Sequence, residues 1–208
     1  MKLISVEGNI GAGKSTLLPK LAEALGFHYL LEPVDSDPEF LRLLTEFNKE
    51  TDSVSARNNF QRYMTNLRAD MLKNVDQNGS YIIERSLLSD LVFTHATMAN
   101  YEKTAEDAGQ HMDCYKHLIG RLLDYPVVNV CVYLRTTPKI SYDRMYNRGR
   151  EAEMKTPLSY IEDLSTFHDA VLPQACRKSG THLITVNWDQ PQSNIDDLVE
   201  TIKAKLAE

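Results

Sequence analysis

The feature that most constrains this chain is a glycine-rich stretch, VEGNIGAGKST, at residues 6–16. A β-type run at residues 2–6 precedes it, and a helical run that ends at Leu25 follows it. Residues 8–15 fit the pattern G-x-x-x-x-G-K-[ST] of the phosphate-binding loop, in the strand–loop–helix context that the pattern requires. Glycines let backbone N–H groups fold around phosphate oxygens, and the next helix directs its positive end at the same anion. The stretch therefore predicts a nucleoside triphosphate site.

Two side chains of this loop have separate predicted tasks. Lys14 supplies a positive charge to the β- and γ-phosphates, and the Ser15 hydroxyl is suited to ligate Mg²⁺. The alternative, a glycine-rich turn that binds nothing, is disfavoured by the intact pattern in its proper context. The loop residues predicted to bind ATP and its phosphates are Gly8, Asn9, Ile10, Gly11, Ala12, Gly13, Lys14, Ser15 and Thr16.

The bulk composition excludes several classes of function. A net charge of −6 and a pI near 5.5 argue against long-range attraction to nucleic acid polymers or anionic membranes. No run of about 18 or more apolar residues is present, so no membrane span is expected. The three cysteines lack a C-x-x-C pair, and the N-terminus enters the first strand without a signal peptide. These features predict a cytoplasmic protein with reduced thiols.

Strand-like and helix-like segments alternate along the chain. Because right-handed crossovers join parallel strands, this alternation predicts an α/β fold: a five-stranded parallel sheet with helices on both faces, of the P-loop type. At 208 residues without a repeat or linker, residues 1–208 are expected to form one domain. The expected strands are 2–6, 27–31, 80–84, 127–134 and 181–188, and the expected helices include 17–25, 39–48, 54–75, 87–101, 105–123, 157–176 and 195–206.

Two stripes run along the helix expected at residues 54–75. Four residues at helical spacing are expected to face the core: Phe60, Tyr63, Leu67 and Met71. A second, mainly polar stripe consists of Arg57, Gln61, Met64 and Arg68. The spacing alone favours a solvated helix face for this second stripe over a polar wall that lines a ligand cleft.

Charged residues follow two expected strands at their carboxyl ends, where ligands bind in open parallel sheets. Pro33 biases Glu32 toward extended geometry at the end of the second strand. Glu84 and Arg85 end the third strand, and Asp90 projects from the first turn of the following helix. For Asp90 the simpler interpretation is a charge that complements the helix dipole.

A dense basic cluster occurs within residues 144–155, a segment that we expect to form a lid over the site. Three arginines fall in a run of seven residues, although the protein as a whole is acidic: Arg144, Arg148 and Arg150. Arg144 and Arg148 are one helical turn apart. A surface charge run is the alternative interpretation. Gly149 between two arginines suits a segment that closes over phosphates.

A phosphate-binding loop alone does not fix function, because switches, motors and kinases share it. The N-K-x-D motif of GTPases is absent, and the third strand ends in Glu-Arg-Ser rather than in the Asp of motor ATPases. Taken in order, the chain instead resembles the deoxyribonucleoside kinase family, from residue 1 to about residue 172. The motifs that carry this resemblance are G-N-I-G-A-G-K-S-T at 8–16, E-P-V at 32–34, F-Q at 60–61, E-R-S at 84–86 and R-x-x-x-R-G-R-x-x-E at 144–153.

The resemblance implies a role for each of these residues. Glu32 would be the general base for the nucleoside 5′-hydroxyl, and Arg85 would hold Glu32 and that hydroxyl in position. Glu84 would bind Mg²⁺ beside Ser15, through water. Glu153 would accept a hydrogen bond from the sugar 3′-hydroxyl, and Gln61 would recognise the base. The lid arginines, which would clamp the phosphates, are Arg144, Arg148 and Arg150.

The resemblance also bears on the base and the sugar. Arg68 and Asp90 occupy the offsets at which family members that prefer purine or cytosine carry an Arg–Asp pair. A carboxylate there would face the O4 oxygen of thymine unpaired. Deoxyadenosine, deoxyguanosine or deoxycytidine is therefore expected ahead of thymidine, with deoxyadenosine first. Phe47 falls near the place of a family tyrosine at the 3′-hydroxyl.

Two other functions remain as alternatives. A nucleoside monophosphate kinase would need more cations at the acceptor than Arg85, and a non-catalytic nucleotide-binding regulatory module would have lost Glu32 or the lid arginines. The favoured function is ATP-dependent phosphorylation of a deoxyribonucleoside 5′-hydroxyl in nucleotide salvage, with Mg²⁺. The resemblance further implies a homodimer through the helices at 87–101 and 105–124.

Overall fold

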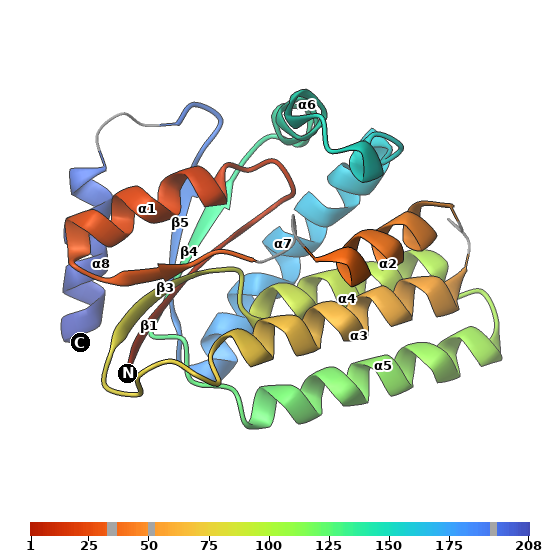
Figure 1. The fold of residues 1–208 in the computed structure, drawn as a ribbon, viewed down its shortest axis with the longest axis horizontal. Helices are drawn as coiled ribbons and strands as arrows, with labels where there is room; N and C mark the ends of the chain where they lie inside the picture. Colours follow the sequence, from red (N-terminus) through yellow and green to blue (C-terminus); the bar gives the residue numbers. More distant parts are fainter. Residues whose placement is uncertain (33–36, 50–52, 192–194) are drawn as a thin grey trace.

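A five-stranded parallel sheet forms the centre of the molecule (Figure 1). The computed structural model describes residues 1–32, 37–49, 53–191 and 195–208. The strand order is β2-β3-β1-β4-β5, so β1 with its following loop lies in the middle. This confirms the predicted α/β fold. The strands are β1 (Lys2–Gly8), β2 (His28–Leu30), β3 (Ser80–Glu84), β4 (Val130–Arg135) and β5 (His182–Asn187).

Helices cover both faces of the sheet. One face is covered by α1 (Lys14–Leu25) and α8 (Asp196–Ala207). The other face is covered by α4 (Leu87–Tyr101) and α7 (Leu158–Ser179), with α3 (Val54–Met71) and α5 (Ala105–Leu123) beyond them (Figure 1). The remaining helices lie near the carboxyl ends of the strands and are α2 (Pro38–Lys49), α6 (Pro138–Arg148) and the short 3₁₀ helix η1 (Glu151–Glu153).

The alternation of side chains in the strands divides the core in two. In β4, Val130, Val132 and Leu134 pack toward α1 and α8, whereas Cys131 and Tyr133 pack toward α4 and α7. All five are buried, as a strand covered on both faces requires. The two helical layers thus hold the carboxyl end of β1 rigidly between β3 and β4.

The element boundaries differ from the sequence expectations in a few places. The helix expected at 54–75 ends at Met71, and the strand expected from residue 127 begins at Val130 because Val127 is exposed and unpaired in the sheet. Ser53 caps α3 by accepting a hydrogen bond from the Ala56 N–H at 3.2 Å. Pro33 and Val34 of the E-P-V motif lie outside the described residues. Within the described part of the chain, none of the helices combines the length and apolar character that crossing a membrane requires.

Candidate active site

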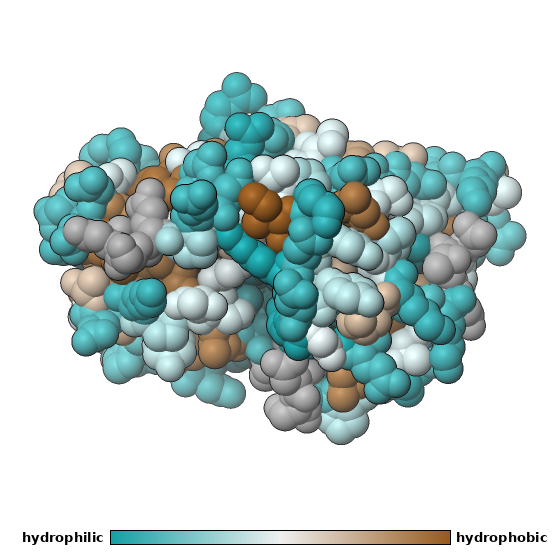
Figure 2. Space-filling view, turned by 90° about the horizontal axis from the view of Figure 1, so that it is seen from above, coloured by the Kyte–Doolittle hydropathy of each residue, from teal (hydrophilic) through white to brown (hydrophobic). Residues whose placement is uncertain are grey.

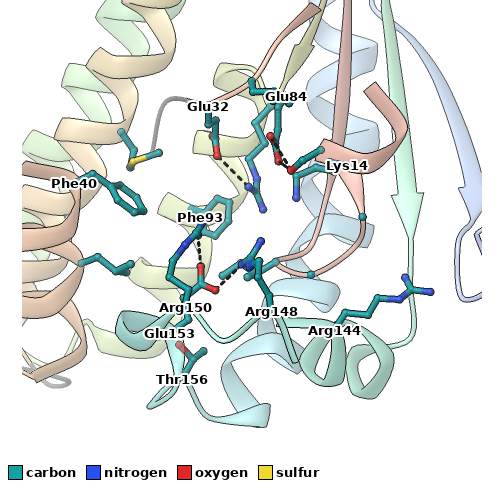
Figure 3. Close-up of a pocket in the computed structure, with 18 of the residues that line it drawn as sticks. Lys14, Glu32, Phe40, Glu84, Phe93, Arg144, Arg148, Arg150, Glu153 and Thr156 are labelled. Atoms are coloured by element: carbon teal, nitrogen blue, oxygen red, sulfur yellow. Dashed lines mark hydrogen bonds and ion pairs between the residues drawn. The ribbon is translucent and has the colours of Figure 1, made fainter. Parts of the chain in front are cut away.

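A cavity of about 490 Å³ opens at the carboxyl ends of β1, β2 and β3. Figure 2 looks onto the surface above the carboxyl ends of the strands, and hydrophobic side chains lie among hydrophilic ones near the middle of this surface. In the close-up, Phe40 and Lys14 face each other from opposite sides, with Glu32 and Glu153 at the two ends between them (Figure 3). The cavity is therefore polar on the side of the glycine-rich loop and apolar on the side of α2.

The glycine-rich loop adopts the geometry that only glycine allows at its critical points. Gly11 has φ +77°, and a Cβ there would lie 2.1 Å from the Ser141 carbonyl oxygen. Gly8 has φ +139°, and its Cβ would lie 2.7 Å from the Leu134 carbonyl oxygen. The loop therefore packs directly against β4 and α6. Its residues that line the cavity are Ile10, Gly11, Gly13, Lys14, Ser15 and Thr16.

Asn9 and Lys14 have different tasks in the loop. The Asn9 side chain donates to the Ile161 carbonyl at 2.8 Å and to the Ser165 hydroxyl at 2.9 Å, so it anchors the loop to α7 instead of lining the cavity. Lys14 Nζ donates to the Asn9 carbonyl at 2.9 Å. Burial, and then repulsion from Arg85, lowers the pKa of Lys14 to about 7. An anion bound in the loop would restore the charged form.

Ser15 and Glu84 meet at the mouth of the loop. The Ser15 hydroxyl lies 2.9 and 3.1 Å from the two carboxylate oxygens of Glu84 (Figure 3). Both groups are hard oxygen ligands, and Mg²⁺ in phosphate sites is commonly held by one or two such groups together with phosphates and water. The pair therefore fits the predicted Mg²⁺ ligands in position and in chemistry.

Glu32 is held by two arginines from different elements. Arg68 Nε of α3 donates to Glu32 Oε1 at 2.6 Å, and Arg85 Nη1 lies 3.4 Å from Glu32 Oε2. Burial alone would raise the pKa of Glu32, but the two guanidiniums outweigh it and hold that pKa below its ordinary value. Glu32 is thus an ionised carboxylate that faces the cavity beside Lys14.

Asp90 lies one layer deeper than expected. It is fully buried and does not line the cavity, but its Oδ1 accepts from Arg68 Nη1 at 2.7 Å, from the Thr65 hydroxyl at 3.2 Å and from the Gln61 amide. Burial raises the pKa of Asp90, with Arg68 acting in the opposite direction. Its other oxygen has no hydrogen-bond partner among the residues that the structure describes.

The interpretation of the polar stripe on α3 as a solvated face is wrong. Arg57 and Arg68 are each 4% exposed and Gln61 is 8% exposed, whereas Phe60 and Tyr63 are only partly buried. Gln61, Met64 and Arg68 line the cavity, and Phe60 does so as well. The spacing could not separate the two faces, because both pack against neighbouring elements.

The three arginines that were predicted to form a lid do not point in one direction. Arg148 Nη2 lies 2.5 Å from Glu153 Oε2, and Arg150 Nη1 lies 2.6 Å from Glu153 Oε1. Arg144 points away from them and donates to the carbonyls of Trp188 and Asp189 at 3.0 and 2.5 Å (Figure 3). All three line the same cavity, as does Glu153.

The apolar wall contains the predicted residue Phe47 together with residues that the sequence analysis did not select. Phe47 packs on Phe60 and Tyr160, with ring centroids 5.4 and 5.9 Å apart. Phe93 stands under the Arg85 guanidinium, whose carbon lies 5.4 Å from the ring centroid. Phe93 is three residues after Asp90 on α4, a spacing that could have indicated it. The strand-end Trp188, the only tryptophan, had no comparable signal.

The fold and the site together define a P-loop kinase. A phosphate-binding loop on the central strand of a five-stranded parallel sheet lies beside an ionised carboxylate, in a cavity large enough for a small organic acceptor.

Comparisons with known proteins identify the family. The model of the family "Deoxynucleoside kinase" matches residues 4–207, so the chain belongs to the deoxynucleoside kinase family. The deoxyguanosine kinase of Dictyostelium discoideum is 29% identical over 188 residues, which is 90% of this chain and 64% of that enzyme. The deoxyadenosine/deoxycytidine kinase of Bacillus subtilis is 28% identical over 206 residues, which is 96% of this chain and 91% of that enzyme.

Solved structures show the same fold. A deoxyadenosine kinase from M. mycoides with bound dATP superposes with a TM-score of 0.76 at 24% identity, over 99% of this chain and 100% of that one. The same kind of enzyme with bound dCTP gives a TM-score of 0.73 at 25% identity, over 99% and 98% of the two chains. The chain is therefore a nucleotide-binding transferase that phosphorylates a nucleoside hydroxyl, as the resemblance predicted.

Proposed function

We propose that this chain transfers the γ-phosphoryl group of ATP to the 5′-hydroxyl of a purine or cytosine deoxynucleoside, with deoxyadenosine preferred. The observation that carries the proposal is the ionised Glu32, held by Arg68 and Arg85 beside Lys14 in one cavity. A base next to a phosphate-binding lysine is what attack of a hydroxyl on a γ-phosphate requires.

In the proposed reaction Glu32 takes the proton of the 5′-hydroxyl as the oxygen attacks the γ-phosphorus. The new O5′–P bond forms while the bond from that phosphorus to the β–γ bridging oxygen breaks, so that ADP leaves with this oxygen. Lys14 stabilises the charge on the β- and γ-phosphates, and Arg85 steadies Glu32 and the attacking oxygen. Catalysis is then mainly positioning and electrostatic stabilisation.

Mg²⁺ is proposed to bind where the Ser15 hydroxyl and the Glu84 carboxylate meet. When bound there with the donor, the ion would neutralise charge on the β- and γ-phosphates. The Ser15 hydroxyl would ligate the ion through an oxygen lone pair while its O–H continues to donate to Glu84.

The base of the nucleoside is proposed to lie against Gln61 and Arg68, which line the cavity, with Asp90 directly behind them. Gln61 offers a paired donor and acceptor. The free oxygen of Asp90 suits an exocyclic amino group, which it would reach once the side chains of Gln61 and Arg68 turn aside as the base binds. Adenine and cytosine both carry such an amino group, and the relative from B. subtilis is named for those two bases. Thymine would leave Asp90 facing a carbonyl oxygen, which costs about 1–3 kcal/mol.

The sugar and the phosphates are proposed to meet at the lid, at about residues 144–155. Glu153 would accept from the 3′-hydroxyl beside Phe47, while Arg148 and Arg150 turn from Glu153 to the phosphates. Arg144 would reach the phosphates only by leaving the carbonyls of Trp188 and Asp189. The nearby charges and the family resemblance support this assignment.

The organisation of the protein is part of the same proposal. Residues 1–208 form one domain that acts on small molecules, without a nucleic acid polymer or membrane as partner. The acidic net charge of −6 supports the first exclusion. By family resemblance, the chain pairs with a second copy through α4 and α5 and works in the cytoplasm.

The test is turnover of ATP with each of the four deoxynucleosides and with dAMP and dCMP, for the wild type and for Glu32→Gln. Phosphorylation of purine or cytosine deoxynucleosides is expected, with kcat lowered about 10²- to 10⁴-fold in the variant. Activity on monophosphates alone would overturn the acceptor assignment. Thymidine as the best substrate would leave the reaction standing and overturn the role of Asp90.

A further inference from the structure

We infer that Glu7 is a positioning residue of the reaction, which fixes Arg85 in its working conformation; this rests on the proposed function. Glu7 lies at the end of β1, inside the glycine-rich stretch, and the reaction as described above does not use it. Its side chain is fully buried and so does not contact substrate. A buried carboxylate is costly unless several hydrogen-bond donors surround it.

Three donors converge on the Glu7 carboxylate. Oε1 accepts from the Ser86 backbone N–H at 2.9 Å and from the Ser86 hydroxyl at 2.6 Å. Oε2 accepts from the Ser89 hydroxyl. Ser86 is the N-cap of α4, so the carboxylate also lies at the positive end of a helix of 15 residues. Glu7 therefore ties the end of β1 to the start of α4.

The residue that these bonds enclose is Arg85. It has φ +59°, and it is the one residue other than glycine with positive φ among the described residues. Such a conformation is unfavourable for a residue that carries a Cβ, and it persists only where the surroundings impose it. The hydrogen bonds between Glu7 and Ser86 fix the peptide group that follows Arg85. The hydrogen bond that Arg85 N donates to the Val6 carbonyl at 3.1 Å fixes the peptide group that precedes Arg85.

The imposed conformation directs the Arg85 side chain into the cavity. Arg85 Nη2 donates to the Gly8 carbonyl at 3.1 Å, and Nη1 lies 3.4 Å from Glu32. The backbone carbonyls of Val6 and Gly8 thus accept hydrogen bonds from Arg85. Glu7, which lies between them, acts through its side chain and binds the next residue, Ser86. Without the carboxylate, the turn at Arg85 can relax, and the guanidinium moves away from Glu32.

The test is a double-mutant cycle on kcat with ATP and the best deoxynucleoside, using Glu7→Gln, Arg85→Ala and both together. Glu7→Gln keeps the size of the side chain but loses the charge. We expect it to lower kcat about 10- to 100-fold, with the KM for ATP changed less than about threefold. In the Arg85→Ala background the same change should have almost no further effect, because the residue through which Glu7 acts is gone.

Ser5→Ala is the matched control, since Ser5 is fully buried on the same face of β1 two residues before Glu7. Its kcat should equal that of the wild type. Additive effects of Glu7→Gln and Arg85→Ala would overturn the inference, because a merely structural role would not depend on Arg85. If Glu7→Gln fails to fold, Ser89→Ala replaces it in the cycle, with a loss of about three- to tenfold expected and additivity again decisive.

Two outcomes separate this inference from the proposed function. A wild type that phosphorylates none of the deoxynucleosides would overturn both. An active wild type whose kcat is unchanged in Glu7→Gln would overturn this inference alone and leave Glu32 as the proposed base.

Discussion

The two ends of the cavity are built in different ways. At the end proposed to bind phosphates, called the phosphate end below, contiguous residues of one loop between β1 and α1 supply the surface, and backbone geometry decides its shape. At the end proposed to bind the nucleoside, called the nucleoside end below, Glu32 and Arg68 are 36 positions apart in the chain, and Arg68 and Asp90 are 22 apart. These residues meet only because β2, α3 and α4 pack together, and the buried ion pairs of Arg68 with the two carboxylates hold them in place.

This difference predicts different kinds of sensitivity. A change at the phosphate end acts through the main chain and should reduce donor binding. A change at the nucleoside end removes a charge from a dry network, so it should act on the free energy of unfolding and on its pH dependence. Substitutions with matched control variants can separate the effect on donor binding from the effect on stability.

The largest effect is expected from Arg68→Met at the nucleoside end. Arg68 is buried between Glu32 and Asp90, so the variant leaves two buried carboxylates without their shared cation. The free energy of unfolding at pH 7 should fall by about 3–5 kcal/mol, measured by urea denaturation. Glu32 keeps Arg85, but Asp90 loses its cation, so burial raises the pKa of Asp90 further above its unfolded value. The folded variant then binds a proton more strongly than the unfolded chain, so it should regain stability as the pH falls toward 5.

Arg42→Met is the control for that variant. Arg42 also bridges two carboxylates, Glu39 and Glu46, but its side chain is 52% exposed. Its loss should leave the free energy of unfolding almost unchanged, because solvent screens exposed ion pairs. Equal losses in Arg42→Met and Arg68→Met would contradict the view that burial makes the nucleoside end depend on charge.

The next largest effect is expected from Gly11→Ala at the phosphate end. The new Cβ would meet the Ser141 carbonyl oxygen at 2.1 Å and the Met145 nitrogen at 2.9 Å, so the loop must shift by an ångström or so. The kcat/KM for ATP should fall about 100-fold. Gly120→Ala in α5, where the Cβ has open space, should leave kcat/KM unchanged and slightly raise stability.

In the wild type, a pH effect on substrate binding is expected for ATP, the phosphate donor. Lys14 has a pKa of about 7 in the free protein, and bound phosphates favour its charged form, so donor binding above pH 7 must take up a proton. The KM for ATP should therefore rise with pH from about 7 to 9, by at most about tenfold per unit. Lys14→Arg, which stays charged, should abolish this rise. A rise that persists in Lys14→Arg would assign it to another group.

The smallest effect is expected from Ser165→Ala on α7. The Ser165 hydroxyl accepts from the Asn9 side chain at 2.9 Å, while the Ile161 carbonyl accepts from the same amide at 2.8 Å. Loss of one of two anchors should lower the free energy of unfolding by about 1 kcal/mol and raise the KM for ATP only slightly. Altered selectivity among nucleosides would show that the two ends are coupled through α7.

The contrast between the two ends also explains what sequence reasoning could reach. The position of the glycine-rich loop was predictable because its motif is local: spacing, glycine and lysine suffice to specify a strand, a loop and a helix. The alternation of strands and helices gave the parallel sheet for the same reason. At the nucleoside end, the spacing of α3 favoured a solvated stripe, and only the family resemblance pointed to Gln61 and Arg68.

The sequence by itself determined the fold class, the donor site and the set of charged residues at the strand ends. The tertiary structure decided which of these residues share a network: Arg68 with both Glu32 and Asp90, Glu153 with Arg148 and Arg150, and Glu7 with the turn at Arg85. The physical reason is the separation along the chain over which each kind of interaction acts. A local motif is fixed by backbone sterics within a few residues, whereas a buried charge finds its partners only when distant elements pack and exclude water.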